Sequence, residues 1–195
     1  MQFDVTDGIL LDGLAELSSK QIEGLHLGFE EIIRGNINDD RRTLNPHFSL
    51  HLKDNTIGET LDALCASDTR YSWSTDGLSI NVPPRGEGPA YLLNLRLERI
   101  SLNEVPDPDQ ALTPLSRLLP NEPIGYFAPG LGDNQYAQPW TVAFGQVTVR
   151  QFINRLAEHM GPRTSWVWAG GSSERIVHFR KGCFFNRIPA SDCDP

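Results

Sequence analysis

The residues that could do chemistry are five histidines, three cysteines and an adjacent pair of glutamates. His47 and His51 face the same side of one expected strand. Four residues at about 3.3 Å per residue place them about 13 Å apart, whereas ligands that share a metal ion lie about 2 Å from it. No cysteine, histidine or carboxylate stands at ligand spacing from the other three histidines, which are His26, His159 and His178. The sequence therefore predicts no metal site and favours an exposed strand face at residues 47–51.

No other residue pattern indicates catalysis. The chain has no Gly-x-Ser-x-Gly nucleophile motif, and Cys65 falls on the apolar side of an expected helix, as a buried structural thiol does. Glu30 and Glu31 point to opposite sides of a strand end, where solvent is the expected environment. Gly130-Leu-Gly-Asp133 is not followed by a helix that could hold a phosphate. We expect neither a catalytic site nor a cofactor.

Cys183 and Cys193 bracket a short segment near the end of the sequence. A disulfide between them would stabilise the fold by about 2–3 kcal/mol through restriction of the unfolded chain. It would also imply an oxidising compartment. The alternative is two unrelated thiols on a frayed tail.

Composition restricts the class of protein and of partner. The 195 residues are 39% hydrophobic and 22% charged, as in a globular protein, and the net charge is −8. This charge argues against nucleic acid as a partner, because binding to phosphates depends on clustered Lys and Arg. No apolar run approaches the ~20 residues of a membrane span. The sequence opens directly on a strand pattern, so either the protein is cytosolic or a signal peptide has been removed.

The strongest pattern along the chain is a repeat. The strand pattern Phe48–Leu52 recurs as Trp140–Phe144, 92 residues later (140 − 48 = 92). The apolar helix positions that follow recur at the same distance: 57, 61 and 64 match 149, 153 and 156. A period of this length indicates a duplicated unit of roughly ninety residues, the size of a small domain.

The repeat and the turn signals divide the chain into two similar units. The first, residues 1–83, reads as strand, helix, strand and then strand, helix and two strands. A Pro- and Gly-rich linker at 84–89 leads to a second unit at 90–182, and residues 183–195 form a tail. The predicted fold class is α+β, with small antiparallel sheets packed on two helices in each unit.

Two motifs in the first unit resemble a known family. Phe3-Asp-Val with Leu10 and Leu14, and later Glu59-Thr-Leu-Asp-Ala-Leu64 with Tyr71, resemble the short N-terminal domain (STN) shared by secretins and TonB-dependent signal-transducing receptors. Ala66-Ser-Asp-Thr69 replaces the glycines of the family pattern. The resemblance covers residues 2–83 well and 90–181 more loosely, through the repeat.

The resemblance implies a non-catalytic, periplasmic or secreted module that docks a protein partner of the cell envelope. We expect docking at a sheet edge, since an extended peptide can add a strand there. The expected contact residues are on the strand at 47–52 and at two aromatic positions: His47, Ser49, His51, Trp73 and Trp168. Self-association within an envelope assembly is a second expectation.

Two alternatives remain open from the sequence. Trp73 and Trp168 could be core residues, because aromatic side chains bury much of the apolar area of small domains. The chain could also be a small-molecule binding protein, or an enzyme with an unfamiliar site, in a cleft between the two units. Several convergent polar groups around a pocket would favour this second alternative.

Overall fold

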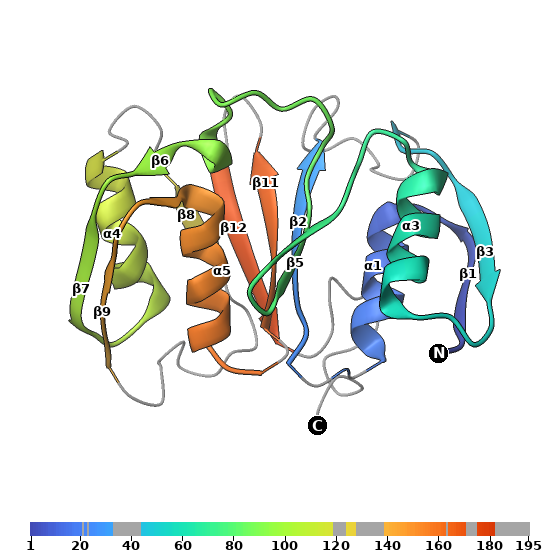
Figure 1. Ribbon diagram of the computed structural model, residues 1–195, viewed down its shortest axis with the longest axis horizontal. Coiled ribbons are helices and arrows are strands. Elements are labelled where there is room, and N and C mark those ends of the chain that lie inside the picture. Colours follow the sequence, from blue (N-terminus) through green and yellow to red (C-terminus); the bar gives the residue numbers. More distant parts are fainter. Residues whose placement is uncertain are drawn as a thin grey trace.

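The computed structural model describes residues 1–20, 22, 24–32, 44–118, 124–127, 139–162, 164–170 and 175–181, a few side chains excepted. The described residues combine four α-helices with a mixed sheet and three two-stranded sheets, so the predicted α+β class is confirmed. Figure 1 shows the layers: the long sheet stands in the middle, helices flank it, and a two-stranded sheet lies at each end. The predicted tail and both of its cysteines lie outside the described residues.

The elements keep a simple order along the chain. The helices are α1 (Leu10–Ser19), α3 (Ile57–Ser67), α4 (Pro108–Leu118), α5 (Val149–His159) and the short 3-10 helix η1 (Leu92–Asn94). The strands up to residue 97 are β1 (Phe3–Gly8), β2 (His26–Ile32), β3 (Phe48–Leu52), β4 (Ser74–Asp76), β5 (Ser79–Val82) and β6 (Arg96–Leu97). The later strands are β7 (Ile100–Val105), β8 (Gly125–Phe127), β9 (Trp140–Phe144), β10 (Val147–Thr148), β11 (Thr164–Gly170) and β12 (Arg175–Lys181).

The central sheet contains six strands in the order β4-β5-β2-β11-β12-β8. The β4–β5 and β11–β12 pairs are antiparallel hairpins, whereas β2 pairs in parallel with both β5 and β11, and β8 pairs in parallel with β12. The sequence predicts separate small antiparallel sheets. The structure differs because β2 and β11, which are far apart in the chain, join their strands into one sheet.

The two faces of the central sheet cover different cores. One core contains β1, α1 and α3 with Leu27 and Phe29 of β2; the other contains β7, α4 and α5. Strand β11 contributes to both, since Val167 packs into the first core and Trp166 and Trp168 into the second. Both faces of β11 are therefore covered, which explains its run of apolar residues.

The two outer sheets, β1–β3 and β7–β9, share an unusual bulge. Asp7 in β1 and Glu104 in β7 both have positive φ, at 47° and 51°, and the strand register shifts beside each. A hydroxyl on the facing strand accepts the bulged N–H in both places: Ser49 Oγ from Asp7 at 3.1 Å and Thr141 Oγ1 from Glu104 at 2.9 Å. The bulge deprives this N–H of a backbone acceptor on the facing strand, and the hydroxyl accepts the hydrogen bond in its place.

The bulge lies just before α1. The helix begins after Ile9, its N-cap residue, two positions beyond Asp7. The carboxylate of Asp12, in the first turn, accepts the Ile9 N–H at 3.0 Å. No helix among the described residues is long and apolar enough to cross a membrane.

Candidate functional site

The outer face of β3 gathers three of the predicted contact residues. Phe48, Leu50 and Leu52 pack inward, and this alternation leaves the side chains at 47, 49 and 51 on the opposite face. His47 and His51 are substantially exposed. Local sequence alone sets this face, because a strand that alternates apolar and polar residues buries only one of its sides.

Strand β1 supplies partners for this face. Asp4 lies across from His51, and its Oδ1 is 2.6 Å from the His51 Nδ1. The Asp7 carboxylate reaches the His47 Nδ1 at 2.9 Å, while the Asp7 backbone N–H donates to Ser49. Pairs this exposed contribute little to stability, so they serve mainly to fix the side chains. The alternation of β1 is the sequence signal that could have identified Asp4, whereas Asp7 lies at the bulge that interrupts this alternation.

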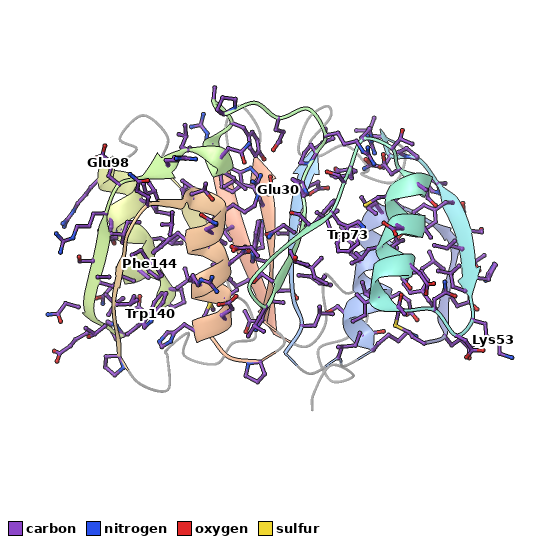
Figure 2. All side chains as sticks on the ribbon, in the orientation of Figure 1. Glu30, Lys53, Trp73, Glu98, Trp140 and Phe144 are labelled. Atoms are coloured by element: carbon purple, nitrogen blue, oxygen red, sulfur yellow. The ribbon has the colours of Figure 1, made fainter. Side chains whose placement is uncertain are left out.

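The two predicted tryptophans lie elsewhere. Trp73 is half-buried, and Figure 2 shows it between the central sheet and α3, where its indole N–H donates to Asp62 Oδ1 at 2.7 Å. Trp168 is only 3% exposed and belongs to the second core. The core alternative therefore describes Trp168, because β11 is covered on both faces. The candidate disulfide, Cys183 with Cys193, lies outside the described residues.

A buried charge cluster lies where β2, α5 and the segment after β5 meet. Glu30 is fully buried, and its two carboxylate oxygens accept from the Nε and Nη2 of Arg150. Arg150 also donates to the Asn94 side chain and lies 3.5 Å from a Glu87 oxygen. The expectation of a solvated strand end is wrong, since Glu31 is buried as well and α5 covers Glu30 and supplies its compensating charge.

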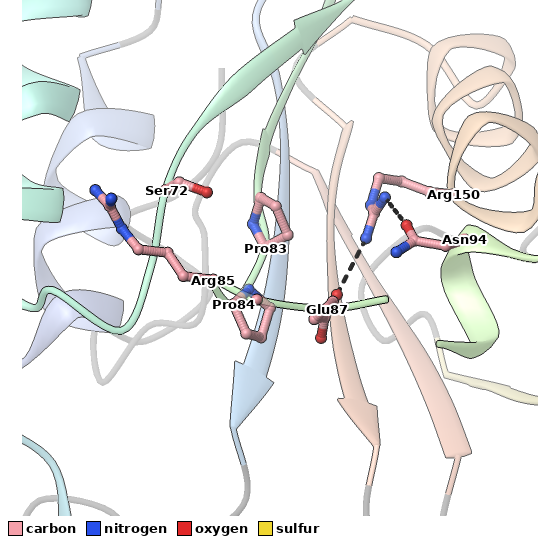
Figure 3. Close-up of a pocket in the computed structure, with 8 residues that line it drawn as sticks. Ser72, Pro83, Pro84, Arg85, Glu87, Asn94 and Arg150 are labelled. Atoms are coloured by element: carbon pink, nitrogen blue, oxygen red, sulfur yellow. Dashed lines mark hydrogen bonds and ion pairs between the residues drawn. The ribbon is translucent and has the colours of Figure 1, made fainter. Parts of the chain in front are cut away.

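A cavity opens beside this cluster. It measures about 400 Å³, and Figure 3 shows Arg150, Asn94 and Glu87 on one side of it and the Arg85 side chain directed away from them. Its lining residues are Ser72, Pro83, Pro84, Arg85, Gly86, Glu87, Asn94 and Arg150. Arg85 donates to the Tyr71 carbonyl at 2.6 Å. The predicted linker thus supplies one wall of the cavity, a role that its turn-rich sequence does not indicate.

Two acidic groups beside the cavity have shifted pKa values. Burial, reinforced by the nearby Glu30 carboxylate, raises the pKa of Glu87 to about 7 against the opposing effect of Arg150. Burial and the charges of Glu30 and Glu87 raise the pKa of Tyr91 as well. Glu87 therefore changes charge near neutral pH. Among the described lining residues, Ser72 has the one hydroxyl and none is a histidine or cysteine, so no nucleophile and base are paired among them.

Other candidate chemistry is limited. A second cavity of about 280 Å³ lies between residues 90–95 and the β11–β12 hairpin, with Tyr91, Trp168 and Arg175 among its lining. Cys65 is buried, as predicted, and burial raises the pKa of its thiol to about 11. Within the part of the chain that the structure describes, no group of three or more His, Cys, Asp or Glu residues could hold a metal ion.

Comparison with known proteins finds no family profile, characterised protein or solved structure that matches the chain. The resemblance to the STN domain therefore stays a prediction.

Proposed function

We propose that this protein is a non-catalytic docking module of the cell envelope, periplasmic or secreted, and that β3 receives an extended segment of a protein partner. The observation that carries the proposal is the position of β3 at a sheet edge. It pairs with β1 on one side, and no other described strand pairs with it. Backbone N–H and C=O groups on such an edge can pair with an added strand.

The outer face of β3 would supply selectivity. In strand addition, backbone hydrogen bonds give affinity and the side chains beside them choose the partner. His47, Ser49 and His51 are held in place by Asp4 and Asp7. Little side-chain order would then have to be gained on binding, which favours affinity.

The order of elements supports the STN-like interpretation of residues 1–83. The chain runs β1, α1, β2 and then β3, α3, β4, β5, as the resemblance implies. The matching bulges, and the matching strand orders β4-β5-β2 and β11-β12-β8, support a second unit of this kind at residues 90–182. We place the module in the periplasm or outside the cell on the basis of this resemblance alone.

Affinity capture from the envelope fraction, with quantitative mass spectrometry, tests the proposal. Ser49→Pro removes an N–H from β3, whereas Thr141→Pro makes the matched change in β9 and serves as the control. Docking at β3 predicts one partner that the wild type and Thr141→Pro capture and Ser49→Pro loses, with all three proteins folded by circular dichroism. A partner that is captured equally by the folded Ser49→Pro variant contradicts the proposal.

The cavity at Arg150 favours a second candidate function, the binding of a small molecule. Its volume of about 400 Å³ is in the range of ligand sites, and charged groups from separate elements converge on it. Thermal shift with a panel of small organic acids and amines tests this function. Ser72→Trp, which would fill the cavity, should abolish any shift; a shift that persists in this variant would place the ligand elsewhere.

A further inference from the structure

The central sheet consists of two groups of three strands with the same internal pairing. In the first group, β4 pairs antiparallel with β5, and β5 pairs parallel with β2. In the second group, β11 pairs antiparallel with β12, and β12 pairs parallel with β8. β11 therefore takes the place in its group that β4 takes in the other, and β8 takes the place of β2.

One junction joins the groups. β2 and β11 lie parallel, with Gly28–Ile32 in register with Trp166–Gly170. The fit is close: a Cβ on Gly28 would lie 2.3 Å from the Trp166 ring, so this position requires glycine. The Arg150–Glu30 ion pair connects α5 to β2 across the same junction. The contact is well packed and built into the fold.

The junction is a head-to-tail contact. It joins the β2 end of one strand group to the β11 end of the other, and these are two different surfaces. Consequently, the strands at the two ends of the sheet correspond to the two strands of the junction: β4 to β11, and β8 to β2. Among the described residues, β4 pairs only with β5 and β8 only with β12. A contact between two different surfaces leaves one surface of each kind unpaired at the ends of the sheet, so it can be repeated between copies.

We propose that the protein self-associates end to end, with β8 of one copy added in parallel to β4 of the next. The partner is a second copy of this chain, because β4 and β8 hold the same places in their groups as the two strands of the internal junction, and among the described residues neither has a second neighbour. Natural edge strands are commonly protected by lysine or proline, yet the residues of β4 and β8 include neither. This contact is separate from the one proposed at β3.

The helices indicate that the contact is weak. α5 spans the internal junction with Arg150, but α3 has Gly58 at the matching position, 92 residues earlier (150 − 58 = 92). No α3 side chain at this position can reach a strand of the next copy. The two end strands are also only three residues long. Association would rest on a few backbone pairs and would require high protein concentration.

Sedimentation equilibrium tests the proposal directly. The wild-type mass should rise above the 21.8 kDa of one chain as concentration approaches about 0.5 mM, within the range where weak contacts are populated. Thr75→Lys adds a charge to exposed β4 and should weaken association at least about tenfold. Ala66→Lys adds the same charge to an exposed position of α3 and should leave association unchanged, as should Ser49→Pro. A wild-type mass that stays at one chain overturns the proposal.

A mixing experiment tests the polarity of the contact. Gly125→Lys blocks the β8 end and is accommodated locally, since a Cβ at Gly125 meets only ordinary contacts at 3.6 Å or more. Thr75→Lys and Gly125→Lys should each be monomeric alone and should form a 1:1 dimer when mixed, through the two unblocked ends. Self-association of Gly125→Lys alone, without a mixed dimer, would indicate a symmetric β4–β4 contact and overturn head-to-tail assembly.

Discussion

Helices α3 and α5 follow the same local rules in different surroundings. Each has 11 residues and follows an N-cap threonine whose hydroxyl accepts the N–H of the residue three positions later, Glu59 or Gln151. In each, a side chain at matching positions accepts an indole N–H: Asp62 from Trp73 at 2.7 Å, and Asn154 from Trp166 at 2.9 Å.

The surroundings decide which polar group is used. Asp62 is exposed and charged, whereas Asn154 is fully buried and neutral. A charge is costly to bury without compensation, and a neutral amide accepts the same hydrogen bond at a smaller desolvation cost. Arg150, an ionic group on the buried side of α5, is paired with Glu30. A shared local pattern therefore sets the helix, while the depth of the helix in the molecule sets its polar chemistry.

The largest effect should come from the ion pair that only α5 has. Arg150→Ala leaves Glu30 buried without a counter-charge, and we expect a loss of about 3–5 kcal/mol in the free energy of unfolding. Urea denaturation measures it. Arg155→Ala, whose side chain is 40% exposed, is the control and should cost less than about 1 kcal/mol. Equal losses in the two variants would contradict a structural role for the buried pair.

Truncation of the side chain at matching core positions of the two helices should lower the free energy of unfolding by similar amounts. Leu61 and Ile153 lie 92 residues apart (153 − 61 = 92), and both are fully buried in their respective cores. Replacement of either by alanine should destabilise the fold by about 2–5 kcal/mol. Thermal unfolding at matched concentration checks both, and an unmoved midpoint for Leu61→Ala would show that the assigned face of α3 is wrong.

The two side chains that accept an indole N–H should contribute differently to stability. Asn154→Ala leaves the buried Trp166 N–H without its acceptor and should cost about 1–3 kcal/mol, the usual desolvation penalty. Asp62→Ala should cost less than about 1 kcal/mol, because water can reach the half-buried Trp73. Tryptophan fluorescence during urea unfolding measures both losses. If Asp62→Ala proves the more damaging change, burial does not control these interactions.

The two N-cap threonines should contribute equally to stability. Thr56→Ala and Thr148→Ala each remove a hydroxyl that accepts a first-turn N–H, at 3.2 and 3.1 Å. Each change should lower stability by about 1 kcal/mol. Chemical denaturation of the two single variants and the double variant checks this equivalence. A loss confined to one helix would break the claim that their local rules are shared.

The pH dependence should separate the two halves of the molecule, because Glu87 belongs to the α5 cluster. Its pKa in the fold, about 7, exceeds the ordinary 4.5, so the fold favours the protonated acid. That contribution to stability is fully present below about pH 4.5 and is lost as pH rises through about 7. Glu87→Gln should abolish this loss, so the wild type should become less stable relative to the variant as pH increases. Parallel stability profiles from pH 4 to 8 would contradict it.

Local features were predictable from sequence, and contacts across the chain were not. The alternation of β3 and the burial of Cys65 depend on neighbours within a few residues, and these predictions agree with the structure. Glu30 depends on Arg150, which is 120 residues away. Arg150 can reach Glu30 because β2 pairs with β11, which brings β2 under α5. No local sequence pattern specifies that pairing.

Trp168 illustrates the same limit. Two aromatic residues on one strand face are compatible with a core or with a contact surface, and the choice depends on what covers the strand. The apolar run Trp166–Ala169, with no polar residue between the rings, was the available signal for a strand buried on both faces. The two cores on opposite faces of the central sheet provide that burial.

Amide hydrogen exchange on the captured complex is the most direct test of docking at β3. Docking at β3 predicts slower exchange at residues 48–52 when the partner is bound, with residues 140–144 of the matching strand β9 unchanged. Unchanged exchange at 48–52, with new protection at residues 83–95 beside the Arg150 cavity, would contradict it and favour a ligand site there.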